Sequence, residues 1–311
     1  MTGIQRGREK LRVTVVGAGA IGAVAAEAAA AAGHEVTLGV RTPIDRLVVE
    51  TDGVAREVPL RVASDPAQVE GADWVLLAVK GQDSAAAAPW LARLSGPETP
   101  VAVLQNGVDH EERVRRLAPA APVLPVLVYI AAERLGPGRV VHRLGGRFQV
   151  PAGDLALRFR DLMSGGGMEV EPVDDFLTAA WRKLLGNVAA NPLTALTESR
   201  IGVMRDPSMG ELARGLLEEA VEIGRAEGAR LEPDDIDRTM EDFAGYPPDS
   251  GSSMLYDRIA RRPLEHELIT GAVVRAADRH GIAAPRNRTI LALLRALDQS
   301  LRSASGGRPQ T

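Results

Sequence analysis

The feature that most constrains this fold is a glycine-rich segment between an apolar strand and an apolar helix. The sequence Gly-Ala-Gly-Ala-Ile-Gly at 17–22 follows the predicted strand Arg-Val-Thr-Val-Val at 12–16 and precedes the alanine-rich run 23–32. In such a segment Gly17 permits a tight turn, Gly19 lets the backbone approach a pyrophosphate, and Gly22 allows close packing of helix and strand. The helix N-terminus adds unpaired N–H groups that attract phosphate. This order predicts a dinucleotide-binding unit, whereas an ordinary turn with surplus glycine is the alternative.

The next predicted strand, 35–41, ends on a basic residue. Units that bind NAD or FAD usually carry Asp or Glu there to hold the ribose hydroxyls, but residues 39–42 read Gly-Val-Arg-Thr. A guanidinium pairs with a 2′-phosphate through two parallel hydrogen bonds, and a carboxylate would repel it. Arg41 therefore predicts NADP(H) as the cofactor. The alternative is a solvated surface arginine.

Composition excludes several classes of protein. The 311 residues suffice for two domains, and 37 basic and 41 acidic side chains give a net charge of −4. This balance gives no sign of a nucleic-acid or membrane surface. The absence of cysteine excludes disulfides, thiolate metal sites and a cysteine nucleophile. Basic residues before the apolar run superficially resemble a secretory signal, but Glu27 interrupts the run and the glycines suit a phosphate loop. We therefore expect a cytoplasmic protein.

Strand and helix patterns alternate through residues 1–173. This alternation predicts a Rossmann-type, doubly wound parallel sheet with ligand groups at the carboxyl ends of its strands. Lys80 and Asn106 follow such strands, and the segment 139–150 is more typical of an antiparallel hairpin at the edge. We expect strands at 12–16, 35–41, 73–79, 100–104, 123–132, 139–144, 148–150 and 168–173, with helices at 23–32, 84–94 and 154–164.

Residues 174–311 predict an all-α domain, so the fold class is α/β with a helical C-terminal half. Capping residues and apolar periodicity mark its helix boundaries. An apolar face in this half is compatible with a homodimer. Residues 303–311 are rich in Ser and Gly and predict a disordered tail. The expected helices are 176–190, 207–228, 234–243, 252–260, 264–280 and 287–302.

One of these helices carries a polar stripe on an apolar background. Lys183, Asn187 and Asn191 recur every fourth residue and share one helix face. Two asparagines on one face cost stability unless they have partners, which indicates a site. Pro192 lacks the backbone donor, so we expect the helix to bend or end there. The alternative is an exposed polar face with Asn191 as a C-cap.

A further polar group surrounds the helix expected at 252–260. Ser252 and Ser253 open it, where hydroxyl and N–H groups suit a carboxylate ligand or simply cap the helix. Glu265 and Glu267 flank His266, but neighbours so close in sequence point apart on a helix, so we expect no metal site. For His266 a partly buried structural role is favoured over that of a catalytic acid.

These segments together resemble the ketopantoate reductase (2-dehydropantoate 2-reductase) family over nearly the whole chain. The resemblance rests on Gly-Ala-Gly-Ala-Ile-Gly, Leu-Gln-Asn106-Gly, Lys183-x3-Asn187-x3-Asn191-Pro-Leu-Thr-Ala-Leu and Ser-Ser253-Met-Leu followed by Glu265. It implies a Rossmann domain and a helical domain that bind NADPH and substrate, and an enzyme that reduces 2-dehydropantoate to (R)-pantoate. It implies Lys183 as the general acid and Glu265 as the group that holds the substrate hydroxyl.

The same resemblance implies the other site residues. Asn187 and Asn191 would orient the substrate, Ser253 would hold its carboxylate, and Lys80 and Asn106 would lie near the nicotinamide ribose. Many members have Asp and Asn where this chain has Glu267 and Thr270. Two alternatives remain: a sister reductase of another 2-oxo acid, and a non-catalytic NADPH sensor. The expected cofactor contacts are Gly17, Ala18, Gly19, Ala20, Ile21, Gly22, Arg41, Lys80 and Asn106.

Overall fold

A computed structural model describes residues 9–306, which fall into two compact units. The first unit contains the described residues up to Gln105 together with His110–Asp174. The second contains Asn106–Asp109 and the described residues from Asp175 onward. The short segment Asn106–Asp109 therefore belongs by its contacts to the helical unit, although both of its neighbours in sequence belong to the first.

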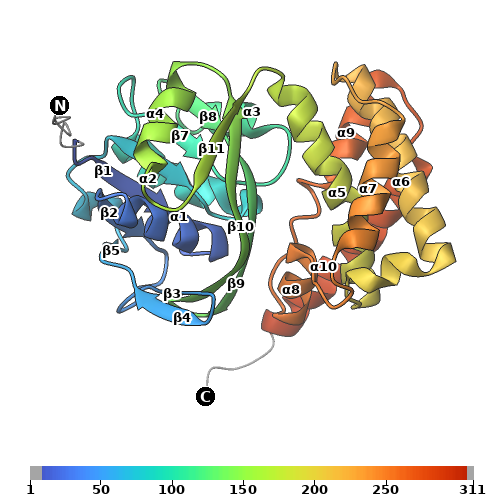
Figure 1. Ribbon diagram of the computed structural model, residues 1–311, viewed down its shortest axis with the longest axis horizontal. Coiled ribbons are helices and arrows are strands. Elements are labelled where there is room, and N and C mark those ends of the chain that lie inside the picture. The colour runs from blue at the N-terminus through green and yellow to red at the C-terminus, as the bar shows by residue number, and fades with distance from the viewer. Residues whose placement is uncertain (1–8, 307–311) are drawn as a thin grey trace, which may run out of the picture. The chain divides into compact units, whose positions relative to one another are not determined.

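A six-stranded sheet with every strand pair parallel forms the centre of the first unit (Figure 1). The strand order β5-β2-β1-β6-β7-β8 places β1 between β2 and β6, where the order reverses. Strands so enclosed are nearly continuous apolar runs because both faces are covered. The predicted α/β fold class is thereby confirmed. The strands are β5 (Arg61–Ala63), β2 (Glu35–Gly39), β1 (Arg12–Val16), β6 (Trp74–Leu77), β7 (Val101–Val103) and β8 (Val123–Pro125).

A second, mixed sheet completes the first unit. The predicted antiparallel pairing forms, because β9 (Leu127–Gly136) runs antiparallel to β10 (Arg139–Pro151). The strands expected at 139–144 and 148–150 are, however, one continuous strand, and β10 also pairs with two further strands, so it does not lie at an edge of the sheet. The strand expected at 168–173 forms as β11 (Glu169–Val173), but it pairs with β10 and lies outside the six-stranded sheet. Strands β3 (Val48–Thr51) and β4 (Val54–Glu57) were not predicted, since β4 is exposed along its length and carries no apolar alternation.

Small side chains allow helix α1 (Ala20–Ala31) to pack closely within the first unit. Residues 23–26, three alanines and one valine, are fully buried, and α1 contacts both sheets. A cluster of Trp74, Phe148 and Phe159 lies in the same core, with ring centroids 5.6 and 5.7 Å apart. The remaining helices of this unit are η1 (Pro66–Gln68), η2 (Gly81–Ala87), α2 (Ala88–Leu94), α3 (His110–Arg115) and α4 (Asp154–Met163).

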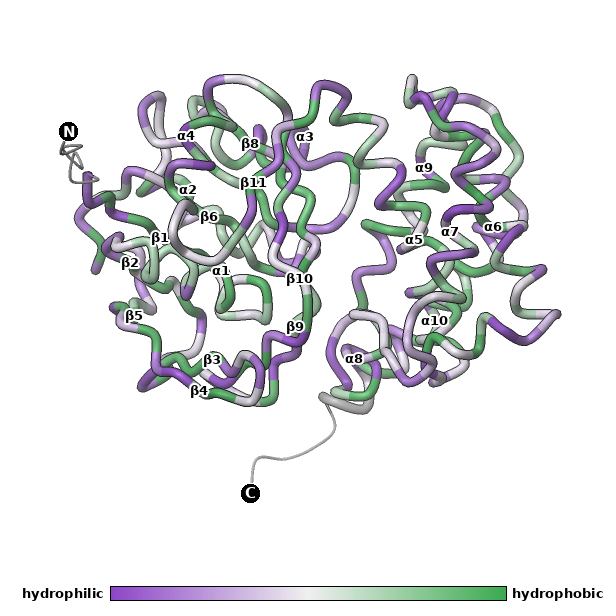
Figure 2. The backbone as a smooth tube through the Cα atoms, viewed as in Figure 1, coloured by the Kyte–Doolittle hydropathy of each residue, from purple (hydrophilic) through white to green (hydrophobic). Residues whose placement is uncertain are grey.

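The second unit is helical and has its own core, centred on Trp181 and Leu185 of the long helix α5. Asp175 caps α5 by accepting from Thr178 N, and Asp206 caps α6 by accepting from Ser208 N. Hydrophobic and hydrophilic stretches alternate along α6 and α7 in Figure 2, as expected of helices buried on one side. The helices are α5 (Phe176–Thr197), η3 (Ile201–Arg205), α6 (Pro207–Ala226), α7 (Asp234–Gly245), α8 (Ser253–Ile259), α9 (Thr270–His280) and α10 (Pro285–Gly306).

The expected helix end near Pro192 is wrong. Helix α5 continues through Pro192 to Thr197 and ends where Glu198 adopts a left-handed conformation, with φ of 55°. Pro192 is buried, so tertiary packing on this face outweighs the local loss of one helical hydrogen bond. The guanidinium of Arg258 donates to the carbonyl oxygens of Ala195 and Leu196, which stabilises the end of the helix.

Two other predicted boundaries also move. The helix expected at 264–280 begins only at Thr270, and residues 265–269 form turns closed by Leu268 N to Glu265 O and Gly271 N to His266 O. Helix α10 extends to Gly306, so the tail expected from 303 begins too early. The rest of that predicted tail, 307–311, lies outside the described residues.

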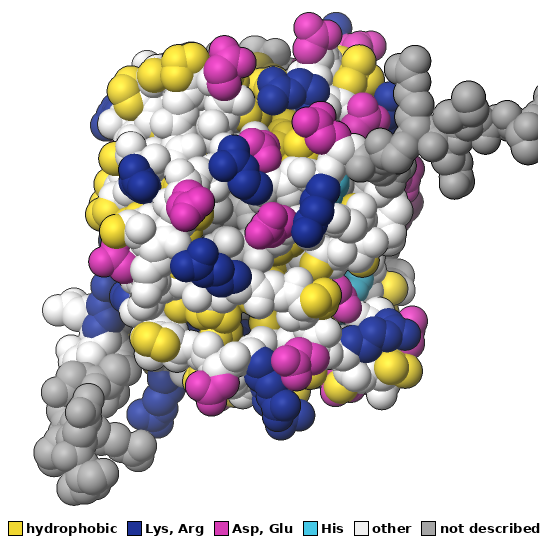
Figure 3. All heavy atoms as spheres, turned by 90° about the vertical axis from the view of Figure 1, so that its left-hand side faces the viewer, with side chains coloured by type: hydrophobic (Ala, Val, Ile, Leu, Met, Phe, Trp, Pro, Cys, Tyr) yellow, Lys and Arg dark blue, Asp and Glu magenta, His cyan; other side chains and the backbone are white. Residues whose placement is uncertain are grey.

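Charged side chains of both signs are interspersed on the face shown in Figure 3. Among residues 9–306, no helix has the length and apolar character needed to cross a membrane.

Candidate functional site

Two glycines of the loop after β1 are required by the geometry of the backbone. Gly17 has φ of +116°, and a Cβ there would lie 2.6 Å from Val79 N. A Cβ on Gly22 would lie 1.9 Å from Gly17 O. A side chain at either position would thus push the loop away from β6 or from α1. The local turn predicted from the sequence needs these glycines for packing, independently of any ligand.

The third glycine leaves space beside the start of α1. Gly19 is the N-cap of the helix, and the nearest atom to a Cβ placed there is Ala78 O at 3.9 Å. The first turn of α1 contains no acidic residue, so the N–H groups and the positive end of the helix dipole are not neutralised locally. The loop follows β1 at the point where the strand order reverses. An open backbone cradle at such a point fits a pyrophosphate.

Arg41 is exposed two residues after the end of β2, and Lys80 is half-buried at the N-cap of η2. Residues 39–42 contain no carboxylate that could bind ribose hydroxyls. The structure thus places Arg41 at the end of the strand next to β1, where the adenosine ribose of a dinucleotide is usually held.

A buried hydrogen-bond network that the sequence interpretation missed supports the loop carrying Lys80. Gln105 Nε2 donates to Val79 O and to Ser84 Oγ, both at 2.9 Å. Ser84 Oγ donates to Gly81 O at 2.7 Å, and His110 Nε2 lies 2.7 Å from Gln105 O. The carbonyls on both sides of Lys80 are therefore fixed by buried side chains. The one available signal was a polar residue, Gln105, at the end of a buried strand.

Lys183, Asn106 and Glu265 meet in the helical unit. Lys183 Nζ donates to Asn106 Oδ1 at 3.2 Å, and Asn106 Nδ2 donates to Glu265 Oε2 at 3.2 Å. Lys183 lies in α5, Asn106 follows β7, and Glu265 lies in the turns before α9. The sequence predicted all three as site residues, but it assigned Asn106 to the cofactor and did not predict that its amide joins the other two.

The surroundings of Lys183 lower the pKa of its amine toward neutral pH. Burial lowers the pKa of Lys183 from 10.5 to about 8, and the charge of Glu265 opposes that shift. Glu265 is only 6% exposed, so its charge acts in an environment that water screens weakly. An ammonium group with this pKa is still mostly protonated at neutral pH and gives up its proton more readily than an ordinary lysine.

The polar stripe on α5 continues beyond Lys183. Asn187 is half-buried and Asn191 is 4% exposed. Asn191 Nδ2 finds no hydrogen-bond partner within residues 9–306. Thr194 Oγ1 lies 2.7 Å from Ser252 Oγ, which joins the stripe to the start of α8. A buried amide without a partner is costly, so Asn191 is suited to a polar ligand.

At the start of α8 the two serines differ. Ser252 is the N-cap and accepts from Leu255 N at 3.1 Å, whereas Ser253 is exposed and is the first residue of the helix. Ser252 therefore has the capping role that was one of the two predicted alternatives. Thr194 was missed, although its position three residues after Asn191 places it on the same face of α5.

His266 and Glu267 lie in turns and not on a helix, so the helical argument against a metal site was based on the wrong local structure. His266 Nδ1 is 3.2 Å from Leu264 O, and its Nε2 is 3.6 Å from Glu267 Oε1. Within residues 9–306, no group of three or more His, Asp or Glu side chains is arranged to hold a metal ion.

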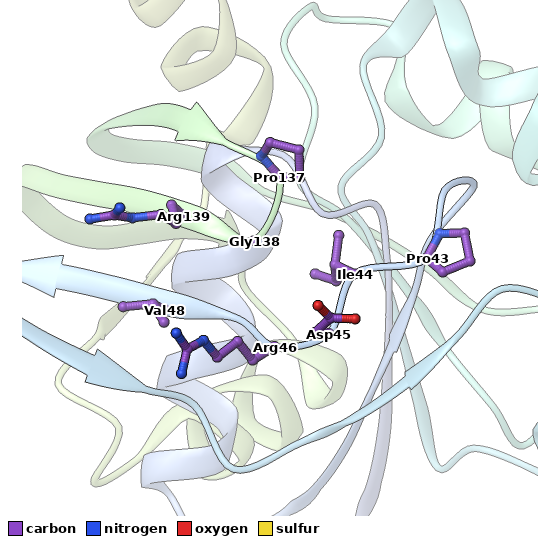
Figure 4. Close-up of a pocket in the computed structure, with 8 residues that line it drawn as sticks. All are labelled: Pro43, Ile44, Asp45, Arg46, Val48, Pro137, Gly138 and Arg139. Carbon is purple, nitrogen blue, oxygen red and sulfur yellow. The ribbon is translucent and has the colours of Figure 1, made fainter.

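A separate pocket of about 490 Å³ lies in the first unit, beside the segment after β2 and the turn between β9 and β10 (Figure 4). Figure 4 shows its two arginines, Arg46 and Arg139, beside β3 and β10. Arg46 pairs with Glu57 at 3.6 Å. No site residue predicted from the sequence lines this pocket. Its lining residues are Pro43, Ile44, Asp45, Arg46, Val48, Pro137, Gly138 and Arg139.

Known proteins similar to this chain belong to one family. The family model described as ketopantoate reductase PanE/ApbA matches residues 13–154, and the model of its C-terminal part matches residues 175–298. The 2-dehydropantoate 2-reductase of Caulobacter vibrioides is 39% identical over 91% of this chain and 98% of its own length. That of Mycobacterium tuberculosis H37Rv is also 39% identical, over 91% of this chain and 97% of its own.

A solved structure gives the same result. A dimeric ketopantoate reductase from Staphylococcus aureus is 29% identical and has a TM-score of 0.84, covering 94% of this chain and all of its own. The family predicted from the sequence motifs is confirmed, and the chain belongs to the ketopantoate reductase PanE/ApbA family.

Proposed function

We propose that this chain reduces the ketone of 2-dehydropantoate to the hydroxyl of (R)-pantoate with NADPH. Membership of a family of oxidoreductases supports a redox reaction, and the relatives named above carry this activity in their names. The observation that carries the proposal is the hydrogen-bonded cluster of Lys183, Asn106 and Glu265. It combines a proton donor, a carboxylate for a hydroxyl group, and an amide that joins them.

The first unit fits the cofactor. Backbone N–H groups at residues 18–22 would hold the pyrophosphate, where no acidic side chain competes. Arg41 would pair with the 2′-phosphate, and Lys80 would lie by the nicotinamide ribose. When bound, NADPH supplies the hydride that reduces the carbonyl carbon. Preference for NADPH over NADH rests on Arg41 and on the absence of a carboxylate at the end of β2.

Lys183 would stabilise and then protonate the substrate oxygen. Negative charge grows on a carbonyl oxygen as its carbon is reduced, and an ammonium group within hydrogen-bond reach lowers the energy of that transition state. The pKa of about 8 means that Lys183 is charged at neutral pH and can release the proton at the end of the step. Proton transfer leaves a neutral amine, which solvent reprotonates.

Glu265 and Asn106 would set the geometry of that transfer. A buried carboxylate can accept from the substrate hydroxyl and fix the distance between that hydroxyl and the reacting carbonyl. Asn106 already contacts both Lys183 and Glu265, so it would hold the proton donor in line with the group that orients the substrate. Asn187 and Asn191 would orient the substrate, and Ser253 would bind its carboxylate.

Steady-state turnover of NADPH with a panel of 2-oxo acids tests the proposal. We expect 2-dehydropantoate to give the highest kcat/KM, with product pantoate of R configuration. A different preferred 2-oxo acid would show a sister reductase, to which the residues Glu267 and Thr270 would be relevant. NADPH binding without turnover of any carbonyl compound would contradict the proposal and indicate a sensor.

We also propose that the chain forms a homodimer, as its Staphylococcus aureus relative does. Large apolar side chains are exposed on the helical unit, including Ile259 and Leu293, both 51% exposed. Light scattering coupled to gel filtration should give twice the chain mass of 33.0 kDa. A monomeric mass at micromolar concentration would contradict this.

A further inference from the structure

Arg275 of α9 contacts two segments that carry site residues but lies outside the Lys183 cluster. Its Nη1 donates to the backbone oxygen of Glu267 at 3.0 Å and lies 3.6 Å from Glu267 Oε2. Its Nη2 lies 3.7 Å from Asp109 Oδ2. Glu267 is two residues from Glu265, and Asp109 is three residues from Asn106. One guanidinium thus joins the segment of Asn106 to the turn of Glu265.

The Glu267 carboxylate is itself held firmly. Arg295 of α10 donates to both of its oxygens, at 2.7 and 3.2 Å, in a bidentate arrangement. A Cβ on Gly271 would lie 2.6 Å from Glu267 Oε2 and 3.2 Å from Arg275 Nη1. The missing side chain of Gly271 therefore makes room for the carboxylate and the guanidinium together. Glu267, Gly271 and Arg275 recur at four-residue spacing, a signal that the sequence interpretation did not use.

The same two segments are also joined inside the site. Asn106 Nδ2 donates to Glu265 Oε2 at 3.2 Å, so Asn106–Asp109 and the turn 265–267 are linked at two places. A hydrogen bond between two side chains alone allows one segment to rotate about it. A second link several residues away removes that freedom, and a displacement of about 1 Å at a reacting group can cost up to 100-fold in rate.

We propose that Arg275 is a positioning residue, which holds the Asn106 segment against the Glu265 turn so that Asn106 bonds Lys183 and Glu265 at the same time. This inference rests on the proposed function, since it assigns Arg275 to the geometry of that reaction. The side chains of Arg275, Glu267 and Asp109 are 44%, 43% and 33% exposed. Ion pairs so exposed contribute little to stability, so the effect belongs to the rate and not to folding.

The test compares Arg275→Ala with Arg279→Ala. Arg279 lies one turn further along α9 and donates to Glu227 at 2.8 and 3.2 Å, so its removal also breaks an ion pair of α9. We expect Arg275→Ala to lower kcat about tenfold at unchanged KM for NADPH, and Arg279→Ala to leave kcat unchanged, with similar small shifts in Tm. Arg275→Lys should keep only part of the wild-type kcat, because lysine lacks the planar guanidinium whose N–H groups reach two carboxylates at once.

A double-mutant cycle separates positioning from general damage to the fold. If Arg275 acts through Asn106, adding Arg275→Ala to Asn106→Ala lowers kcat by much less than tenfold. The inference would be overturned if the fold-losses in kcat of the two single variants multiplied in the double variant. Equal kcat values for Arg275→Ala and Arg279→Ala would also overturn it. Should Arg275→Ala not fold, Asp109→Ala removes the acceptor of the same link from the other side, with a similar expected loss. A wild-type chain that reduces no 2-oxo acid would instead defeat the proposed function.

Discussion

The glycine loop of the first unit and the Lys183 cluster of the helical unit are built in opposite ways. The loop consists of consecutive residues and offers backbone groups, whose geometry Gly17 and Gly22 secure. The cluster consists of side chains separated by 77 and 159 residues in sequence. A phosphate can be recognised by any correctly shaped run of N–H groups, whereas proton transfer requires particular side chains at particular distances. In the proposed function, cofactor recognition is therefore local in the sequence, whereas the groups for catalysis are not.

The glycine loop and the Lys183 cluster also differ in the kind of charge that they offer. The start of α1 has no ionised side chain in its first turn and relies on the dipoles of the peptide groups. The Lys183 cluster relies on an amine whose pKa burial has lowered to about 8. Changes in the loop should thus alter cofactor affinity, and changes in the cluster should alter the chemical step.

Replacing Lys183 should give the largest effect and leave the other site intact. Lys183→Ala removes the proton donor, which typically costs about 10²–10⁴-fold in kcat. The Kd for NADPH, measured by fluorescence titration, should stay within about twofold of wild type. Lys10→Ala, at an exposed lysine of the first unit, is the control and should match wild type in both measurements. Parallel losses of kcat and NADPH affinity in Lys183→Ala would remove the distinction between the two sites.

Arg41→Ala should have the next largest effect, confined to the cofactor. Loss of a charge-assisted hydrogen bond costs about 1.5–3 kcal/mol, or about 10- to 100-fold in the Kd for NADPH. The Kd for NADH should change little, since NADH lacks the 2′-phosphate. Calorimetric titration of both cofactors measures the ratio. Equal affinity of the unaltered protein for NADPH and NADH would contradict the role of Arg41.

A smaller effect is expected when the backbone of the loop is disturbed. In Gly22→Ala the added methyl group meets Gly17 O, so the loop must shift, at a cost of about 1–3 kcal/mol in unfolding free energy. The Kd for NADPH should rise about tenfold, with kcat of the saturated enzyme nearly unchanged. Gly96→Ala is the control, because a Cβ at Gly96 meets no atom within 4 Å. An unchanged Kd in Gly22→Ala would show that the loop does not contact the cofactor.

A change of pH near neutrality should alter kcat/KM less than any of the substitutions above. In the proposed mechanism Lys183 acts as an acid, so activity should require its charged form, which dominates below its pKa of about 8. We expect kcat/KM on the alkaline side to fall twofold at about pH 8 and then tenfold per pH unit. Initial rates measured between pH 6 and 10 give the pH dependence of kcat/KM. A profile that stays level to pH 10 would contradict a lowered pKa.

The sequence predicted the loop well because each of its signals is local. Gly17, Gly22 and the flanking apolar runs determine one turn, and the strand-turn-helix order followed from them. The cluster was predicted only as separate residues. The place of Asn106 after a strand predicted a ligand contact, and the family resemblance assigned that contact to the cofactor, whereas its contacts with Lys183 and Glu265 depend on the tertiary fold.

The errors have the same origin. Local propensity ends a helix near Pro192, but the buried face of α5 carries it on to Thr197. Apolar periodicity extends a helix back over Glu265, but the ion pairs of Glu267 with Arg275 and Arg295 accompany a turn there. Arg295 lies 28 residues from Glu267 in sequence, so no pattern within a short window reveals this partner. Arg275 lies only eight residues from Glu267, and its spacing was visible in the sequence but was not used.

The most direct test of the account is the titration of the Lys183 amine itself. The chain contains only three lysines, Lys10, Lys80 and Lys183, so NMR of protein labelled in its lysine side chains can follow each one. We predict a signal with a midpoint near pH 8 that is absent from Lys183→Ala and that coincides with the alkaline midpoint of kcat/KM. In Glu265→Gln this midpoint should move lower, because the charge of Glu265 raises the pKa of Lys183. A Lys183 signal that titrates near 10.5, or apart from the kinetic midpoint, would contradict the claim that Lys183 supplies the proton.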